Sequence, residues 1–338
     1  MLWQLKKNVL IILGNGFSID LMKTIGKTDE INLGNLFACG ADVPWPATNA
    51  SGFLSFQNCP NLWTLGARPY LDKDKALNII EEVITCANIL PQRIEIKDKI
   101  YIRAYNELEQ YLMSLFVYYT NKVNLAKYKK KLHDWGWVKY LKTLNSDKNI
   151  KSIHIVSLNY DVWLELILDM FSLPYSIDGF SADKKKIHIY KPHGSIAFHS
   201  VKRDKAAYCI PDRYSFDNHK LTEFKYDNKN LDCLNIINAI IPPAGDSSRM
   251  KQSWSAEIRN HIKVQASGLT KNDLVIICGI SYWHVDRQEI DTYLSVIPAD
   301  IKHLVMVNPY PPEVLNAVLM TLFDQYVVIA NSTNLLKL

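Results

Sequence analysis

The sequence predicts an α/β protein with a Rossmann-like parallel sheet, helices on both faces of that sheet, and a helical insertion. Three observations predict this class. Short apolar runs alternate with amphipathic stretches of helical length, which is the rhythm of β-α-β units. The runs at residues 9–13 and 274–278 are apolar at every position, as in strands covered on both faces. Polar residues and glycines follow such runs directly, where open parallel sheets bind their ligands.

The composition is that of a folded globular protein. Of the 338 residues, 48% are hydrophobic and 22% are charged, so neither a disordered chain nor a membrane protein is indicated. The net charge of +5 is mild. The short lysine runs at residues 129–131 and 184–186 are typical of a solvated surface, so direct nucleic-acid binding is not predicted.

The cysteines and the start of the chain indicate a cytoplasmic protein. Six cysteines lie far apart without a C-x-x-C pair, which predicts reduced thiols and no zinc site. The apolar run after Lys6 and Lys7 ends at Gly14, so it is too short for a signal peptide or a membrane span. We therefore expect a cytoplasmic location and no membrane contact.

The first part of the chain is expected to hold one strand, a long loop and then helices only. Residues 24–71 are rich in glycine and proline, which is typical of a lid or binding loop. Asp72 or Asp74 can cap the helix that follows. Periodic apolar residues then predict helices over residues 77–87, from 105 to 123, and over 125–133 and 138–145. Residues 72–150 thus form the helical insertion.

The alternation of strands and helices returns after residue 150. Strands are expected over residues 153–157, 187–191, 236–241, 274–278, 303–307 and 326–329. Helices are expected over residues 162–171, 254–266 and 312–322, with another beginning at Asp286. Residues 198–234 show no clear period and remain unassigned. Together, residues 1–71 and 151–338 are expected to form the α/β domain.

Three polar side chains at strand ends are the candidates for catalysis. Asn159 and Asp161 follow one expected strand, and His193 follows the next, directly before Gly194. An amide, a carboxylate and an imidazole would meet there, because parallel strands end at one edge of a sheet. Asp161 can equally cap the next helix, whereas Asn159 is expected to face the ligand. His193 suits a general base, although a lone histidine is more often structural.

Glycines at strand ends are the candidates for binding. Gly14 and Gly16 follow the first strand in a loop that can bring backbone N–H groups up to a phosphate. A tight turn is the alternative, because Ile19 replaces the third glycine of the dinucleotide fingerprint. Residues at later strand ends suit phosphate, ribose or adenine contacts, or else turns: Gly279, Ser281 and Asn308.

In their order along the chain, these motifs resemble the sirtuin superfamily, and most closely its prokaryotic sirtuin-like branch of NAD-consuming antiphage effectors. The resemblance extends from residue 9 to about residue 310, outside the helical insertion. The motifs are Leu13-Gly14-Asn15-Gly16-Phe17-Ser18, Leu158-Asn159-Tyr160-Asp161, His193-Gly194-Ser195, Ile241-Pro242-Pro243, Gly279-Ile280-Ser281 with Asp286, and Val307-Asn308-Pro309.

The resemblance implies a function for each of these residues. The diphosphate of NAD would be held by Gly14, Asn15, Gly16 and Ser18. The catalytic pair would be Asn159 and His193, with Asp161 beside them. The adenosine side would be contacted by Gly279, Ser281 and Asn308.

The chain departs from sirtuin deacetylases in two places. It has no four-cysteine zinc ribbon, and Ile19-Asp20-Leu21-Met22 stands where those enzymes carry a proline-arginine segment. Cleavage of NAD itself is therefore expected instead of protein deacylation. NAD would be the substrate, with no zinc or other cofactor.

The implied activity is that of an NAD+ hydrolase, which releases nicotinamide and leaves ADP-ribose. The resemblance also implies a toxic effector of antiphage defence that acts by NAD depletion, as in abortive infection. Control is expected from a separate sensor or activator protein, or from a homo-oligomer. A non-catalytic module that binds NAD or ADP-ribose is the alternative. A dehydrogenase is disfavoured by Ile19 and by the lack of an acidic residue ending a second strand.

Overall fold

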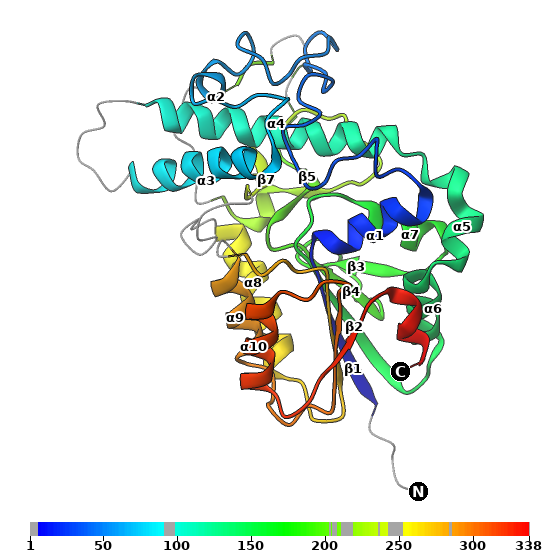
Figure 1. The fold of residues 1–338 in the computed structure, drawn as a ribbon. Helices are drawn as coiled ribbons and strands as arrows, with labels where there is room; N and C mark the ends of the chain where they lie inside the picture. The colour runs from blue at the N-terminus through cyan, green and yellow to red at the C-terminus, as the bar shows by residue number, and fades with distance from the viewer. Residues whose placement is uncertain are drawn as a thin grey trace, which may run out of the picture.

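The computed structural model shows an α/β fold built on one seven-stranded parallel sheet (Figure 1). It describes residues 6–90, 99–202, 204, 208–210, 219–235, 237–242, 253–283 and 286–337. The strand order is β10-β9-β8-β1-β2-β4-β3. The strands are β1 (Lys7–Leu13), β2 (Ile150–Ser157), β3 (Tyr175–Ile177), β4 (Ile187–Tyr190), β8 (Leu274–Cys278), β9 (His303–Val307) and β10 (Val327–Ile329). The predicted Rossmann-like class is confirmed.

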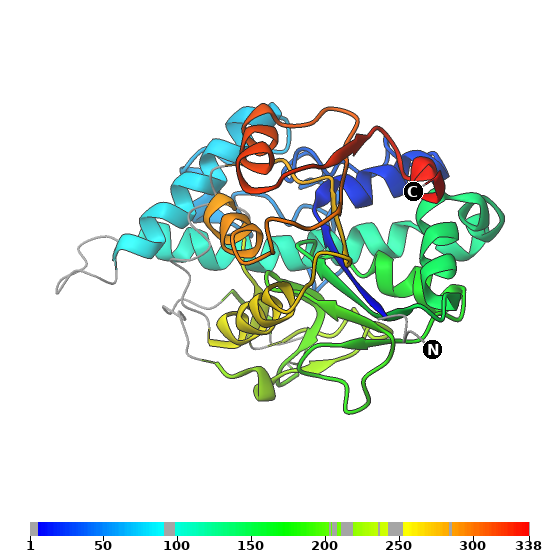
Figure 2. The ribbon, with the colours of Figure 1, turned by 90° about the horizontal axis from the view of Figure 1, so that it is seen from below.

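Helices cover both faces of the sheet. Figures 1 and 2 show α8, α9 and α10 on one side and α1, α6 and α7 on the other. The longer helices are α1 (Asn15–Ile25), α3 (Lys73–Ile89), α4 (Ile100–Lys122), α6 (Gly136–Ser146), α7 (Trp163–Met170), α8 (Ser253–Ser267), α9 (Arg287–Leu294) and α10 (Glu313–Leu322). The shorter ones are α2 (Pro60–Thr64), α5 (Lys129–Asp134), and the 3₁₀ helices η2 (Leu125–Tyr128), η4 (Leu221–Glu223) and η5 (Ser332–Lys337).

The predicted strands form because their apolar runs are buried between the two helical layers. Strand β1 pairs with β2 on one side and with β8 on the other, and residues 9–13 are at most 1% exposed. Burying such a run on both faces stabilises a central strand, since each large apolar side chain contributes about 1.5–3 kcal/mol when it leaves water. Strands β8 and β9 have the predicted bounds.

Two long helices between β1 and β2, α3 and α4, lie at the end of the molecule where the strands finish. Figure 1 shows α3 and α4 lying across that end. Helix α4 packs on residues 194–199 and 238–240, and its Phe116 ring lies 5.3 Å from that of Tyr160, just after β2. Helix α3 begins as predicted, because the carboxylate of Asp72 accepts the N–H of Lys75 at 2.9 Å. The described part of residues 72–149 contains helices and their connections.

A second, antiparallel sheet was not expected from the sequence pattern. Its order is β6-β5-β7, with β5 at Gly194–His199, β6 at Lys225–Tyr226 and β7 at Asn238–Ile240. The expected strand at 236–241 therefore lies here instead of in the parallel sheet, while Ile236 and Pro243 fall outside the described residues. Part of the unassigned stretch 198–234 also belongs to this sheet. Within the described ranges, every helix is too short or too polar to pass through a lipid bilayer.

Candidate active site

The turns that carry the predicted site residues lie at one edge of the sheet. Strands β1, β2 and β4 are neighbours, and β8 flanks β1 on its other side. The chain moves outward from β1 to β2 and then to the edge strand β3, places β4 between β2 and β3, and returns to β8 on the other side of β1, from where it moves the opposite way to β9 and β10. Such a reversal is where doubly wound folds bind ligands, just beyond the carboxyl ends of the strands. The sequence-predicted motifs follow these strand ends.

The glycines after β1 and β8 let two turns meet backbone to backbone. A Cβ on Gly16 would lie 2.4 Å from Cα of Gly279, and one on Gly14 would lie 2.7 Å from its carbonyl oxygen. The N–H of Gly16 donates to the carbonyl of Gly279 at 3.0 Å, and that of Gly14 donates to Cys278 at 2.9 Å. These glycines are thus required for the packing of the turns. Phosphate contact through the amino end of α1 stays a prediction.

Asn159 connects the end of β2 to the turn after β1. Its side-chain amide donates to the carbonyl of Gly14 and to the hydroxyl of Ser18, each at 3.1 Å. The side chain is only partly buried, so part of it remains accessible. The predicted catalytic amide and the predicted phosphate turn are therefore in direct contact.

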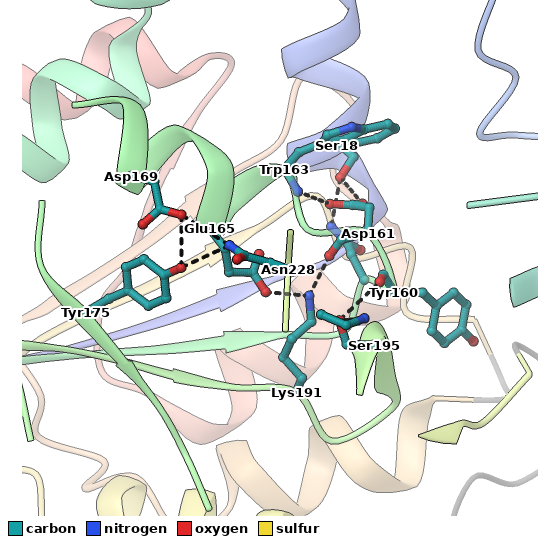
Figure 3. A network of polar contacts seen from close by, with 12 residues as sticks. Ser18, Tyr160, Asp161, Trp163, Glu165, Asp169, Tyr175, Lys191, Ser195 and Asn228 are labelled. Atoms are coloured by element: carbon teal, nitrogen blue, oxygen red, sulfur yellow. Dashed lines mark hydrogen bonds and ion pairs between the residues drawn. The ribbon is translucent and has the colours of Figure 1, made fainter. Parts of the chain in front are cut away.

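Asp161 is a buried structural anchor. One carboxylate oxygen accepts the hydroxyl of Ser18 at 2.8 Å, and the other accepts the N–H of Trp163 at the start of α7 (Figure 3). The second contact reaches the first residue of α7, but the N-cap position is held by Val162, so Asp161 is not the cap residue that the sequence allowed. Burial raises the pKa of the Asp161 carboxyl, although the charge of Lys191 and the hydrogen bond from Ser18 oppose the shift. Asp161 is only 4% exposed, so it stabilises the turn after β2 from inside the protein.

Lys191 joins the end of β4 to the turn after β2. Its ammonium donates to the backbone carbonyl of Asp161 and pairs with the carboxylate of Glu165 at 2.9 Å (Figure 3). Both side chains are almost fully buried. Since Asn159 and His193 each lie two residues from this link, it holds their two turns in a fixed relation.

His193 lies in a turn whose next residue, Gly194, has to be a glycine. Gly194 has a φ of +86°, and a Cβ there would come within 1.8 Å of the carbonyl oxygen of Ala239 on β7. The carbonyl of His193 accepts the N–H of Ile241 at 3.0 Å, which fixes the backbone of the turn against the second sheet. The His193 side chain is 7% exposed.

The imidazole of His193 faces a carboxylate that the sequence pattern did not reveal. Its Nε2 lies 3.0 Å from Oε2 of Glu289 on α9. The same carboxylate lies 3.0 Å from the guanidinium of Arg259 on α8 and accepts the hydroxyl of Tyr293 at 2.6 Å. One sequence signal was present: Glu289 stands beside Ile290 and four residues before Tyr293, on the apolar side of its helix.

The charges around His193 set its protonation. Burial alone would lower the pKa of this imidazole, but the charge and hydrogen bond of Glu289, with the charge of Asp286, raise it above its usual value. Burial alone would likewise raise the pKa of Glu289, but the His193 and Arg259 charges and the Tyr293 hydroxyl hold it well below its usual range. The pair therefore has a carboxylate that stays ionised and an imidazole of increased basicity.

Of the three remaining predicted residues, Asn15 and Asn308 make hydrogen bonds within the protein. The amide of Asn15 donates to the carbonyl of Leu33 at 2.9 Å, which ties α1 to the irregular segment. Asn308 accepts the N–H of Tyr310 at 3.0 Å, the turn contact that its position allowed. Ser281 is exposed and precedes Tyr282, a non-glycine residue with a φ of +52°. Contact of these three residues with a ligand stays a prediction.

The arrangement suits proton transfer at a ligand held over the strand ends. A partly accessible amide, a buried histidine with a carboxylate partner and a helix amino terminus lie on adjoining turns. In the described parts of the chain, no group of three His, Cys, Asp or Glu side chains is placed to hold a metal ion. No protein-family model matches the sequence, and no curated protein matches it significantly.

Proposed function

We propose that this chain is an NAD+ glycohydrolase, which cleaves the bond between nicotinamide and ribose and leaves ADP-ribose. One observation carries the proposal: the amide of Asn159 contacts the Gly14 turn at the edge where β4 also delivers His193. A dinucleotide with its diphosphate at the amino end of α1 would bring its ribose to these side chains. The motif order that resembles sirtuin-like NADases supports the same assignment.

In the proposed reaction, the protein acts on water and ribose. Nicotinamide leaves as a neutral molecule from a cationic precursor, so the barrier lies in forming an oxocarbenium-like ribose. Asn159 would orient the ribose or the water. His193 would accept a proton from the water as it bonds to C1. A positioned base of this kind contributes roughly 10²- to 10⁴-fold in rate, or about 3–5 kcal/mol.

Replacing the base tests the proposal. We expect purified protein to convert NAD to nicotinamide and ADP-ribose, and His193→Ala to slow this by roughly 10²- to 10⁴-fold, because the general base is lost. The products are separated by chromatography. His133→Ala is the matched control, because that side chain is 63% exposed on α5. Asn159→Ala should also lose turnover.

The outcomes separate the activity from its assigned residues. Equal turnover by the parent and by His193→Ala would remove His193 from the mechanism. If the parent leaves NAD intact, the assay is repeated in lysate of cells that carry the neighbouring genes, which would supply an activator. Failure there as well would end the hydrolase proposal.

A non-catalytic module that binds NAD or ADP-ribose is the second candidate. It is favoured by the contacts of Asn159, because its amide already donates to the Gly14 carbonyl and to the Ser18 hydroxyl and can therefore have a structural function. Calorimetric titration distinguishes the two candidates. A binding module would bind NAD tightly, would not consume it, and would bind equally well as the His193→Ala variant.

On the resemblance alone, we propose that the protein is a cytoplasmic effector of antiphage defence, activated by a partner protein or by self-association. The helical insertion is the proposed surface, and Ile89 on α3 is 57% exposed there. Light scattering should show parent protein larger than one chain, and Ile89→Glu should shift it toward the monomer, because burying a charge is costly. An unchanged mass for Ile89→Glu would remove this surface from the proposal.

A further inference from the structure

The carboxylate of Glu289 is held by three groups from three parts of the chain. Oε2 meets Nε2 of His193 and the guanidinium of Arg259, each at 3.0 Å, while Oε1 accepts the hydroxyl of Tyr293 at 2.6 Å. Glu289 is 6% exposed and lies 96 residues from His193. A buried carboxylate is stable only when it is paired and hydrogen-bonded in this way. Its position is thus fixed before any ligand binds.

This contact decides which ring nitrogen of His193 is free. A carboxylate facing Nε2 keeps the proton of the neutral imidazole on that atom, because the N–H can then donate to it. Nδ1 is then the nitrogen that can accept a proton. When it does so, the imidazolium forms beside an ionised carboxylate that is already in place, so little reorganisation is needed.

We propose that Glu289 is a positioning residue for the reaction: it orients His193 with the proton on Nε2 and leaves Nδ1 as the base. This inference rests on the proposed function. In the step concerned, an O–H bond of water breaks and its proton passes to Nδ1, while the oxygen bonds to C1 of the ribose. The C1–nitrogen bond breaks, and its electron pair leaves with nicotinamide. The proton on His193 then passes to solvent.

The charged groups that face His193 shift its pKa in opposite directions. Glu289 and Asp286, at the start of α9, favour the imidazolium, whereas Arg259 on α8 disfavours it. The charges of the same two carboxylates also act on the phenol of Tyr160, after β2, whose pKa is raised chiefly by burial and whose hydroxyl donates to the carbonyl of Ile241. Glu289→Gln should therefore lower the pKa of His193, and Arg259→Gln should raise it.

The first measurement is the titration of His193 by nuclear magnetic resonance of protein labelled with ¹⁵N-histidine, with the signals assigned through His193→Gln. We expect the neutral ring to carry its proton on Nε2 in the parent and to lose this preference in Glu289→Gln. The exposed Glu257→Gln on α8 is the matched control. An unchanged tautomer and pKa in Glu289→Gln would overturn the proposal. If that variant does not fold, the parent protein decides, and a neutral ring that carries its proton on Nδ1 overturns the proposal.

The second measurement is the pH profile of NAD hydrolysis. Glu289→Gln should lower kcat by roughly 10²-fold or more, with KM little changed, and should move the acidic limb of kcat/KM to lower pH. A merely structural residue would reduce activity without moving that limb, and such a result would overturn the proposal. The histidine titration needs no turnover. It therefore decides whether Glu289 sets the tautomer and pKa of His193 even if the chain does not hydrolyse NAD, a result that would overturn the proposed function separately.

Discussion

At the scale of single residues, Lys191 tests how the site is held from beneath. Its ammonium and the carboxylate of Glu165 lie 2.9 Å apart and are almost completely buried. Replacing Lys191 with Met should destabilise the fold by about 3–5 kcal/mol, because the carboxylate of Glu165 would stay buried without its cation. Urea unfolding at pH 7 measures the loss.

The double variant separates the ion pair from its packing. Lys191→Met combined with Glu165→Leu should regain much of the lost stability, since a buried ion pair can often be replaced by apolar side chains. Lys139→Met breaks an exposed pair with Asp134 and should leave stability nearly unchanged. If the double variant were no more stable than Lys191→Met alone, the isolated charge would not be the cause.

At the scale of elements, the turn between β4 and β5 depends on Gly194. Gly194→Ala should destabilise the protein by more than about 2 kcal/mol, because a left-handed alanine costs roughly 1–2 kcal/mol and its Cβ would also meet the Ala239 carbonyl. The shift of the turn should also reduce the proposed NAD hydrolysis. Unfolding and activity are measured together. Gly34→Ala is the control, since the nearest atom to its Cβ would be 3.6 Å away. Equal losses of stability in Gly194→Ala and Gly34→Ala would contradict the argument.

Elements whose signal is local could be predicted from the sequence. Strands such as β8 and β9 are continuous apolar runs, and α4 has an apolar stripe at helical spacing, so their type and position follow from residues close in sequence. Strand β5 was missed because it is fully buried, begins within the His193-Gly194 turn, and pairs with residues that come 26 to 46 positions later. Strand β3 has only three residues, too few for a period.

In the candidate site too, residues with a local signal could be placed from the sequence, and residues that depend on long-range packing could not. Asn159 and His193 could be predicted because each follows a recognisable strand, and parallel strands end at a common edge. Glu289 could not, because its contact with His193 depends on how α9 packs against a turn 96 residues earlier. The support from Lys191 was missed for a similar reason: a lysine at a strand end is usually solvated, and only the packed structure shows it paired with Glu165.

At the scale of the whole molecule, a polar seam joins β2 and β4 of the parallel sheet, formed by Ser152, His154, His188 and Tyr190. The rings of His154 on β2 and His188 on β4 are stacked, with centroids 5.3 Å apart. His154 contacts the hydroxyls of Ser152 and Tyr190 at 2.8 and 3.0 Å. Burial lowers the pKa of His154 from 6.5 to about 4, with help from the charges of His188 and nearby lysines. The folded protein thus keeps this imidazole neutral where an unfolded chain would protonate it.

This difference makes acid destabilise the fold through His154. Above pH 6.5, His154 is neutral in the folded and the unfolded chain, so it has no effect on stability. Between pH 6.5 and pH 4, only the unfolded chain binds the proton. The free energy of unfolding therefore falls by up to about 1.4 kcal/mol per pH unit, and by about 3 kcal/mol in all. We expect His154→Gln to lose less stability than the parent from pH 7 to pH 4.5 in urea unfolding. Asp161 and His193 have raised pKa values and therefore stabilise the fold as the pH falls, in the parent and in His154→Gln alike. The test is thus the difference between the two proteins in how steeply the free energy of unfolding falls with pH. His133→Gln, at an exposed site, should follow the parent. Parallel curves for the parent and His154→Gln would mean that the seam takes up its proton without cost to the fold.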